Sequence, residues 1–312
     1  MVIDSMSERY NLGSASINRD LLEELYIKQK LTVEEVGRRT SRSYSTIRRR
    51  LQEFGIPRRQ SFRFKVQYPK KPFSGDPIEA SYLLGFRAGD IAARRHGRQI
   101  ELLTSTTHPS MISLFDERFE RYGRVGRYPL KISKHEFAWT IWALVNKSFN
   151  FLLRKPKIIS KEILENDKRF LAFMAGYVDA EGCFSVEKSR KTLRFRVLIS
   201  SKDHGILKGI NSKLKEMGYN PGFSFSKGIS YLCLGRKEEV VRLSSLLPLK
   251  HHEKVRMRDL ICFARYSNLD FESKWSILKS RIKDEVMACK IEAKNTWFRS
   301  RLQGFFSGKN RK

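Results

Sequence analysis

A duplicated stretch is the feature that most limits how this chain of 312 residues can fold. The first copy reads YLLGFRAGD (82–90) and then ELLTSTTHPSMISLFDERFERYG (101–123), and the second reads FMAGYVDAEG (173–182) and then VLISSKDHGILKGINSKLKEMG (197–218). Each copy predicts a small-residue helix ending in an acid, a strand, a Ser/Thr-rich turn and an amphipathic helix closed by Gly. Chance similarity is the alternative, but the elements agree in order as well as in composition. A repeat of about 90 residues is too long for a solenoid unit and indicates a duplicated α/β subdomain.

The charge of the chain indicates its class of partner. It has 62 Lys and Arg against 33 Asp and Glu, which gives a formal charge of +29 and a pI near 10.2. A protein this basic repels itself, and polyanions are the partners that offset the repulsion. Because 40% of its residues are apolar, the chain can fill a core and is not a disordered polycation. We therefore expect a folded protein that binds nucleic acid.

Three further observations bear on location. No apolar run approaches the ~18 residues that a membrane-spanning helix needs. The first ten residues, MVIDSMSERY, contain acids and lack the apolar segment of a signal peptide. The cysteines show no C-x-x-C pairing of the kind found in zinc ribbons. We expect a protein of the cytoplasm, nucleoid-associated when bound to DNA, or of an organelle, and no membrane or secreted protein.

The N-terminal part predicts a small all-α domain over residues 1–68. Between residues 42 and 71, ten Lys or Arg accompany one acid, Glu53. Thr32 and Glu35 have the spacing of a capping box, which starts a second helix after a first one. After a short turn, YSTIRRRLQEFGI predicts a third helix that is strongly basic.

Two short helices joined by a tight turn, the second of them basic, resemble a helix-turn-helix. In such units the start of the second helix meets base edges in the major groove of DNA. A protein-binding three-helix unit is the alternative. The residues expected to contact bases or phosphates are Arg42, Tyr44, Ser45, Arg48 and Arg49.

The rest of the chain divides around the duplication. PKKPFSGDP (69–77) is rich in Pro, Gly and Ser and predicts a linker. We expect the first duplicated half over residues 78–160, the second over 161–290, and a basic C-terminal tail over 291–312.

Both predicted motif helices carry small residues four positions apart, at Gly85 and Gly89 and at Gly176 and Ala180. Small residues at this spacing let two helices approach almost backbone to backbone. If these helices pack together, the acids that follow, Asp90 and Glu181, emerge at the same end. Two neighbouring carboxylates repel each other. A hard cation such as Mg²⁺ (or Mn²⁺) relieves this repulsion and can assist phosphodiester hydrolysis.

These two motifs resemble those of the LAGLIDADG homing endonucleases. MAGYVDAEG (174–182) matches the nine-letter pattern at most positions, with Glu181 at the place of the family's metal-binding acid. LLGFRAGDI (83–91) keeps both glycines and the acid Asp90, but it has Ala88 where the family often has an acid and Ile where it often ends in Gly. Both acid positions that the family's chemistry requires are therefore filled.

The resemblance covers roughly residues 78–290 and implies an α+β fold. In that fold a monomer consists of two pseudo-symmetric αββαββα halves whose sheets form a DNA-binding saddle. It also implies a site-specific double-strand DNA endonuclease of intron homing, which hydrolyses phosphodiesters at a long recognition site with Mg²⁺ (or Mn²⁺) held by Asp90 and Glu181. A helix-turn-helix domain fused to this core is similar to known members.

The resemblance further implies basic or polar groups beside the metals. The first candidates are Lys250 in LPLKHHEK and Lys155 in FLLRKPK, with Lys254 and Lys157 as alternates and Ser105 and Ser200 as weaker candidates. An ordinary surface position is the alternative for each lysine. The histidines show no zinc-binding spacing, so His251 and His252 are expected at the surface.

A basic strand face is expected to meet the DNA. TLRFRVLIS (192–200) alternates apolar residues with Arg194 and Arg196, and GRYPLKIS (126–133) and FSFSKG (223–228) have a similar mixture. The residues expected on the DNA-binding surface are Arg94, Arg95, Arg98, Arg127, Lys131, Lys188, Arg194, Arg196 and Lys227.

Two other classes of function remain open at this point. One is a non-cleaving or bifunctional nucleic-acid-binding protein, either a DNA-binding regulator or an intron RNA maturase with intron RNA as a further partner. The paired acids argue against a protein without cleavage but leave a maturase open. The other is a basic structural protein of chromatin, which would leave the two acid-ended helices unexplained.

Overall fold

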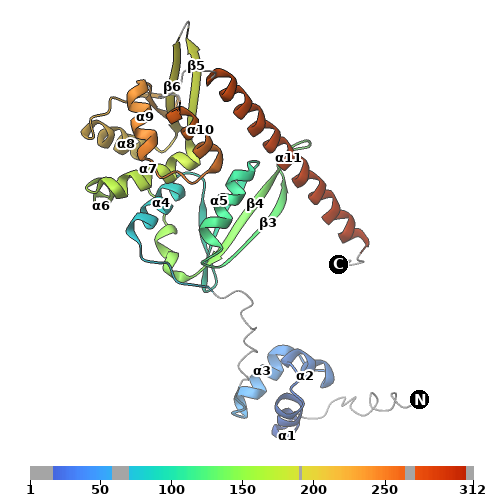
Figure 1. The fold of residues 1–312 in the computed structure, drawn as a ribbon. Coiled ribbons are helices and arrows are strands. Elements are labelled where there is room, and N and C mark those ends of the chain that lie inside the picture. The colour runs from blue at the N-terminus through green and yellow to red at the C-terminus, as the bar shows by residue number, and fades with distance from the viewer. Residues whose placement is uncertain (1–16, 58–69, 190–191, 264–270, 307–312) are drawn as a thin grey trace. The chain divides into compact units, whose positions relative to one another are not determined.

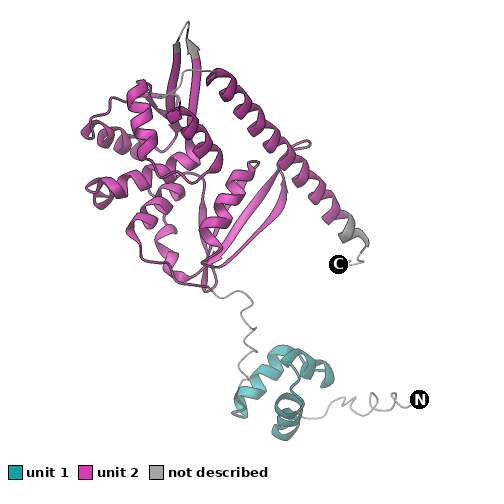
Figure 2. Ribbon diagram, in the orientation of Figure 1, with its two compact units in different colours: residues 1–67 teal, residues 68–312 magenta. Residues whose placement is uncertain are grey.

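The computed structural model describes residues 17–57, 70–189, 192–263 and 271–306. The chain divides into two compact units, residues 1–67 and residues 68–312 (Figures 1 and 2). Within the described ranges, no helix is both long enough and apolar enough to cross a membrane.

The first unit is helical. It contains α1 (Arg19–Leu22), a π-helical turn (Glu23–Lys28), α2 (Val33–Arg39) and α3 (Tyr44–Glu53). The expected capping box is present, because Thr32 Oγ1 accepts a hydrogen bond from the Glu35 amide and the Glu35 carboxylate accepts one from the Thr32 amide. The fully buried side chains of Val36, Ile47 and Leu51 join α2 to α3 in one apolar core. The turn between them is tight, since a Cβ on Gly37 would overlap the carbonyl oxygen of Arg42.

The second unit contains two halves with the same order of elements (Figure 1). The first half consists of α4 (Pro77–Ala88), β1 (Ala92–His96), β2 (Gln99–Thr106), α5 (Pro109–Phe119), β3 (Arg124–Lys131), β4 (Phe137–Val145) and a 3-10 turn (Lys147–Leu152). After α6 (Lys161–Leu164), the second half consists of α7 (Asp167–Glu181), β5 (Gly182–Ser189), β6 (Thr192–Ser201), α8 (His204–Glu216), β7 (Gly222–Ser226), β8 (Ile229–Leu234) and α9 (Lys237–Leu246). Two further helices follow, α10 (His252–Phe263) and α11 (Phe271–Phe306).

Each half builds one four-stranded antiparallel sheet. The strand orders are β1-β2-β4-β3 and β5-β6-β8-β7, so the second sheet repeats the topology of the first. The expected α+β fold with two duplicated halves is confirmed. The closing element differs between them, because the first half ends in the 3-10 turn and the second in α9.

The two motif helices, α4 and α7, pack against each other through their glycines. A Cβ on Gly85 would overlap the carbonyl oxygen of Phe173, and a Cβ on Gly176 would overlap that of Tyr82. Any larger side chain at either position would therefore push the helices apart. The small-residue spacing read from the sequence has this steric cause.

The alternation of side chains gives each sheet one covered and one exposed face. Across β5 and β6, Phe184 pairs with Val197 on the covered face, whereas Glu187 pairs with Arg194 on the exposed face. In the first sheet, Leu102 pairs with Ala143 in the core. The predicted alternation of residues 192–200 is confirmed.

Both predicted borders of the second unit differ from the structure. Within the predicted linker 69–77, the Lys71 amide donates to the Tyr122 carbonyl (3.1 Å) and the Phe73 ring packs 5.2 Å from that of Phe149. At the other end, α11 runs through the predicted start of the tail at residue 291. Its Trp297 packs against Phe137 of β4, so apolar contacts hold both segments to the second unit.

Candidate active site

The end of the α4–α7 pair brings the two predicted acids together. Gly89 ends α4 and lies so close to α7 that a Cβ there would overlap the Ala180 side chain and lie 3.1 Å from Glu181 Cγ. Asp90 follows Gly89 directly, and Glu181 is the last residue of α7. The structure therefore places both acids at the same end of the helix pair, as their position after the small residues predicted.

The two carboxylates are close enough for the charge of one to shift the pKa of the other. Burial raises the pKa of Glu181, and the negative charge of Asp90 raises it further. Partial desolvation raises the pKa of Asp90, although the residue is exposed, and the positive charges of Lys254 and Lys155 oppose the shift. A cation bound between two such carboxylates would stabilise their ionised forms.

The donor set fits a hard divalent metal that is completed by other ligands. The described residues contain no group of three or more His, Cys, Asp or Glu side chains arranged to hold a metal ion. Mg²⁺ is commonly held by only one or two carboxylates, with phosphate oxygens and water as its remaining ligands. Asp90 and Glu181 would supply those carboxylates here.

A third acid of the motif, Asp179, has a structural position. It is fully buried, and its Oδ2 accepts hydrogen bonds from the Tyr82 hydroxyl and from the Lys250 amide, both at 2.7 Å. Burial raises the pKa of its carboxyl group. The sequence analysis did not assign Asp179 a role, although the motif contains it and its counterpart in the first half is Ala88.

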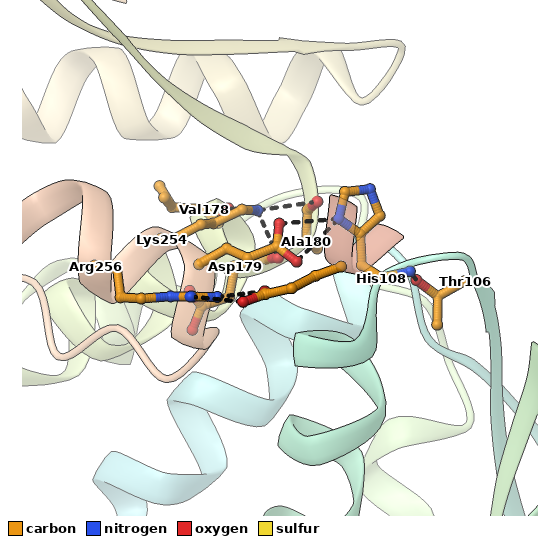
Figure 3. A network of polar contacts seen from close by, with 9 residues as sticks. Thr106, His108, Val178, Asp179, Ala180, Lys254 and Arg256 are labelled. Carbon is orange, nitrogen blue, oxygen red and sulfur yellow. Dashed lines mark hydrogen bonds and ion pairs between the residues drawn. The ribbon is translucent and has the colours of Figure 1, made fainter. Parts of the chain in front are cut away.

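The two lysine candidates of the second half occupy different places. Lys250 contributes its main-chain amide to Asp179, whereas the Lys254 ammonium lies against the C-terminal end of α7 (Figure 3). Lys254 Nζ donates to the carbonyl oxygens of Val178 (2.5 Å), Asp179 (2.6 Å) and Ala180 (3.4 Å). A lysine in this position can bond to the last carbonyls of a helix, of which Val178 also accepts from the Gly182 amide. Burial lowers the pKa of Lys254, and the nearby Asp179 and Asp90 oppose that shift. Lys254, the alternate, is therefore the lysine nearer to the acids.

In the first half, the predicted Lys155 lies beside the second motif. Its Nζ is 3.0 Å from Oδ2 of Asp203, which precedes α8, and its charge lowers the pKa of Glu181. The carbonyl of Lys157, the alternate, lies against Gly205 at the start of α8. Lys155 thus comes from one half and lies beside the acid of the other.

A cavity of about 470 Å³ opens beside Asp90. Its lining residues come from both halves and include Asp90, Ser105, Thr106, His108, Ala138, His251, Glu253 and Lys254. Ser105 and Ala138 belong to the exposed-face register of the first sheet, so the cavity adjoins that face. The weaker candidate Ser105 therefore lies at the cavity, whereas Ser200 is exposed at the corresponding end of β6.

Three cavity residues were missed or misplaced by the sequence analysis. His108 and Glu253, which lie 145 residues apart, are paired at 2.9 Å. His251 was expected at the surface, and that expectation is wrong, since its residue is only 3% exposed. Burial lowers the pKa of His251 to about 2, so its ring is neutral. No sequence spacing links these residues, because α5 and α10 meet only in the folded chain.

Residues 170–245 match the family model of the LAGLIDADG-like domain. This segment is a LAGLIDADG-like domain. It begins in α7, contains Glu181 and ends in α9, so it coincides with the second half of the duplication. None of the curated protein sequences matches the chain.

Solved structures show likenesses to the chain as well. The homing endonuclease I-WcaI bound to its DNA recognition sequence has 16% identity and a TM-score of 0.43 over 55% of this chain and 81% of that one. I-DmoI in complex with DNA and Mn has 17% identity and a TM-score of 0.35 over 55% and 97%. The N-terminal LAGLIDADG domain of DUF199/WhiA has 14% identity and a TM-score of 0.39 over 58% and 88%.

In the LAGLIDADG-like domain, two of the predicted DNA-binding residues lie on the exposed sheet face. Arg194 and Arg196 are there, and Arg196 pairs with Glu187 at 3.3 Å. Lys227 lies in the turn between β7 and β8. Lys188 pairs with Leu193 in the strand register, and its side chain is outside the described part.

The first half repeats this arrangement for Arg94, which shares the exposed face with its partner Glu101 (2.5 Å). Arg98 lies in the turn between β1 and β2. Arg95 is exposed but pairs with Ile100, which belongs to the covered-face register.

Two predicted residues of the first half lie on the other face. Arg127 is opposite the buried Ile141, stacks 5.1 Å from the Trp139 ring and pairs with Glu292 of α11 (3.9 Å). Lys131 Nζ lies 5.2 Å from the ring of Trp297, also in α11. Both residues are exposed, but they point to the side of the sheet where α11 packs rather than to the face of Arg94. Their role in DNA binding stays a prediction.

The predicted contact residues of the helical first unit lie at its surface. Ser43 caps α3 by accepting from the Thr46 amide (3.2 Å). Next to it, the predicted contacts Arg42, Tyr44, Ser45, Arg48 and Arg49 are all exposed. The side of α3 that holds Ile47 and Leu51 is buried, so the cationic side is free of the core. The role of these residues in binding stays a prediction.

Proposed function

We propose that this protein is a site-specific endonuclease that hydrolyses both strands of duplex DNA with the help of a divalent metal, Mg²⁺ or Mn²⁺. The observation that carries the proposal is the pair of carboxylates, Asp90 and Glu181, at the common end of two helices packed through their glycines. Paired acids with raised pKa values beside a cavity are typical of catalytic sites.

The surroundings of the acids support this role. Arg94, Arg194 and Arg196 lie on exposed sheet faces, where they are suited to phosphate contacts along a duplex. The cavity beside Asp90 has room for the water that attacks phosphorus. A bound metal would supply a Lewis acid that lowers the pKa of water and offsets phosphate charge. The Lys155 and Lys254 ammonium groups lower the pKa of both acids and so favour the ionised form that holds a cation.

The helical first unit would extend the contacted site. We propose that α3 is the recognition helix of a helix-turn-helix, with Arg48 and Arg49 on the duplex and the whole chain acting as a monomer. Each phosphate contact that such a residue makes contributes about −0.9 to the slope of log affinity against log salt. Arg48→Ala is therefore expected to make that slope shallower by about one unit if the residue binds phosphate.

The deciding experiment is a cleavage assay on DNA that the protein itself selects. Fragmented DNA of the source organism is incubated with the protein without divalent metal, and the bound duplex is recovered, sequenced and resynthesised. Mg²⁺ or Mn²⁺ is then added to the wild type and to the Asp90→Asn and Glu181→Gln variants. We expect the wild type to cut both strands and each variant to be slower by at least about 100-fold.

Two outcomes would contradict the proposal. Variants that cut like the wild type would show that the acids do not hold the metal. A wild type that binds the selected duplex but leaves both strands intact would favour the alternative of a non-cleaving DNA-binding protein. Competition by a structured intron RNA, measured on the same protein, would then identify the maturase-like case.

A further inference from the structure

The cavity beside Asp90 contains a histidine–carboxylate pair that the proposed function does not use. His108 precedes the first turn of α5, and its ring Nδ1 lies 2.9 and 3.1 Å from the two carboxylate oxygens of Glu253 in α10. Glu253 is only 5% exposed, whereas the side chain of His108 is 45% exposed. A buried carboxylate in this position accepts a hydrogen bond from Nδ1–H, which fixes the orientation of the ring. Nε2 is then the ring nitrogen that can bind another group.

The pair lies at the acid of one motif and at the junction of the two halves. His108 and Asp90 line the same cavity, so the ring and the carboxylate face the same space. The next residue of α10, Lys254, binds the end of α7. Glu253 and Lys254 therefore fix two sides of the cavity from one helical turn (Figure 3 shows Lys254 and His108 there).

The corresponding position of the second half has different chemistry. Asp203 precedes α8 as His108 precedes α5, and it pairs with Lys155 rather than with a carboxylate. The negative charge of Asp203 raises the pKa of Glu181. The two acids thus have unlike neighbours, an imidazole beside Asp90 and a carboxylate–ammonium pair beside Glu181.

We propose that His108, held by Glu253, orients the attacking water at the Asp90 side of the site, so that this pair governs the cut in only one of the two DNA strands. This inference rests on the proposed function. Nε2 accepts a hydrogen bond from the water and aligns its oxygen with phosphorus. Correct alignment of a reacting group of this kind contributes roughly 10- to 1,000-fold to a rate.

The test measures the two strands separately. The selected duplex carries a different fluorescent label on each strand, and single-turnover cutting is followed with Mg²⁺. We expect His108→Ala to slow one strand by about 100-fold and to leave the other within about 3-fold of wild type. His108→Gln, whose amide oxygen can accept the same hydrogen bond, should recover part of the loss, and affinity for the duplex without metal should be unchanged.

The chain offers two matched controls. His252, adjacent to the pair on α10, bridges to Glu117 of α5 (2.9 Å), so His252→Ala tests whether bracing of the two halves is enough. His204 begins α8, and its ring is hydrogen-bonded to Ser230 of β8 (2.8 Å). Both variants should cut the two strands in the wild-type ratio.

A stability loss can be separated from the proposed effect. His108→Ala leaves Glu253 buried without its partner, which is destabilising. The double variant His108→Ala/Glu253→Gln removes that buried charge, so it should regain melting temperature yet keep the strand bias.

The possible failures are distinguishable. If the wild type binds the duplex and cuts neither strand, the proposed function fails and this inference falls with it. If the wild type cuts but His108→Ala slows both strands equally, or neither, only the role of His108 is overturned. A matching loss of affinity without metal would make His108 a DNA-binding contact instead and would also overturn it.

Discussion

The two motif helices are alike along their lengths and unlike at their ends. Along the interface, the contacts are reciprocal, with Gly85 of α4 on the backbone of α7 and Gly176 of α7 on the backbone of α4. At the end of α7, Lys254 from another helix binds three carbonyls. After α4, Arg87 of the same helix binds the carbonyls of Ile91 (2.6 Å) and Leu152 (2.8 Å).

The two halves share the packing between their motif helices but differ in the donors that bond to the helix ends. Backbone-to-backbone packing leaves one steric solution, so both copies keep glycine. The donor that bonds to the carbonyls beside each acid can come from any nearby element of the fold. The two acids can therefore differ in rigidity and in surroundings while their helices stay matched.

The largest expected effect is on stability, from substitutions in the reciprocal interface between α4 and α7. Gly85→Leu and Gly176→Leu should each destabilise the second unit by more than about 4 kcal/mol, because each side chain would overlap backbone of the opposite helix. Urea unfolding of the full chain measures both. Gly235 has open space around its Cα and a Gly235→Ala variant is the control, expected within about 0.5 kcal/mol of wild type. Clearly unequal effects at Gly85 and Gly176 would show that the interface is not reciprocal.

A smaller effect is expected from removing the side chains that bond to carbonyls at the ends of α7 and α4. Lys254→Met removes a buried donor that bonds to three carbonyls at the end of α7 and should cost about 2–4 kcal/mol. The Arg87 side chain is half-buried, and Arg87→Met should cost about 1–2 kcal/mol. The comparison uses urea midpoints measured under the same conditions. Equal losses would mean that the two helix ends are secured equally well and would remove the distinction drawn between them.

The smallest effect concerns the acids without metal. Because burial and Asp90 raise the pKa of Glu181, its ionised form destabilises the folded chain, and this penalty grows as pH rises from the ordinary glutamate value of 4.5 through the raised one. Glu181→Gln should therefore raise the melting temperature by about 2 °C at pH 8. The gain should shrink as the pH approaches 4.5. A gain that is independent of pH would point to packing rather than charge.

Added Mg²⁺ should raise the melting temperature of the wild type but not that of Glu181→Gln.

Much of this architecture could be predicted from short-range pattern. The four-residue spacing of Gly85 and Gly89, and of Gly176 and Ala180, predicted the helix pair because helical periodicity puts such residues on one side. The alternation around Arg194 and Arg196 predicted the exposed face because strands have a period of two. Both are properties of a few consecutive residues, so one sequence is enough to show them.

The errors came from contacts between distant parts of the chain. Arg127 and Lys131 are exposed, as the strand pattern predicted, but each contacts α11, which comes far later in the sequence. His108 and Glu253 are 145 residues apart and have no common motif. Local pattern cannot tell a face that meets solvent from one that meets a later helix.

Helix α11 also determines how far the two sheets can separate. Its first residue, Phe271, packs 5.2 Å from Phe195 of the second sheet, and Trp297 packs 5.7 Å from Phe137 of the first (Figure 1). A helix of 36 residues is about 54 Å long, and its rigid length sets the distance between the two anchoring contacts. Its length can change only in steps of about 1.5 Å with a turn of about 100° at each step, and one inserted residue would therefore rotate one anchor away from its sheet.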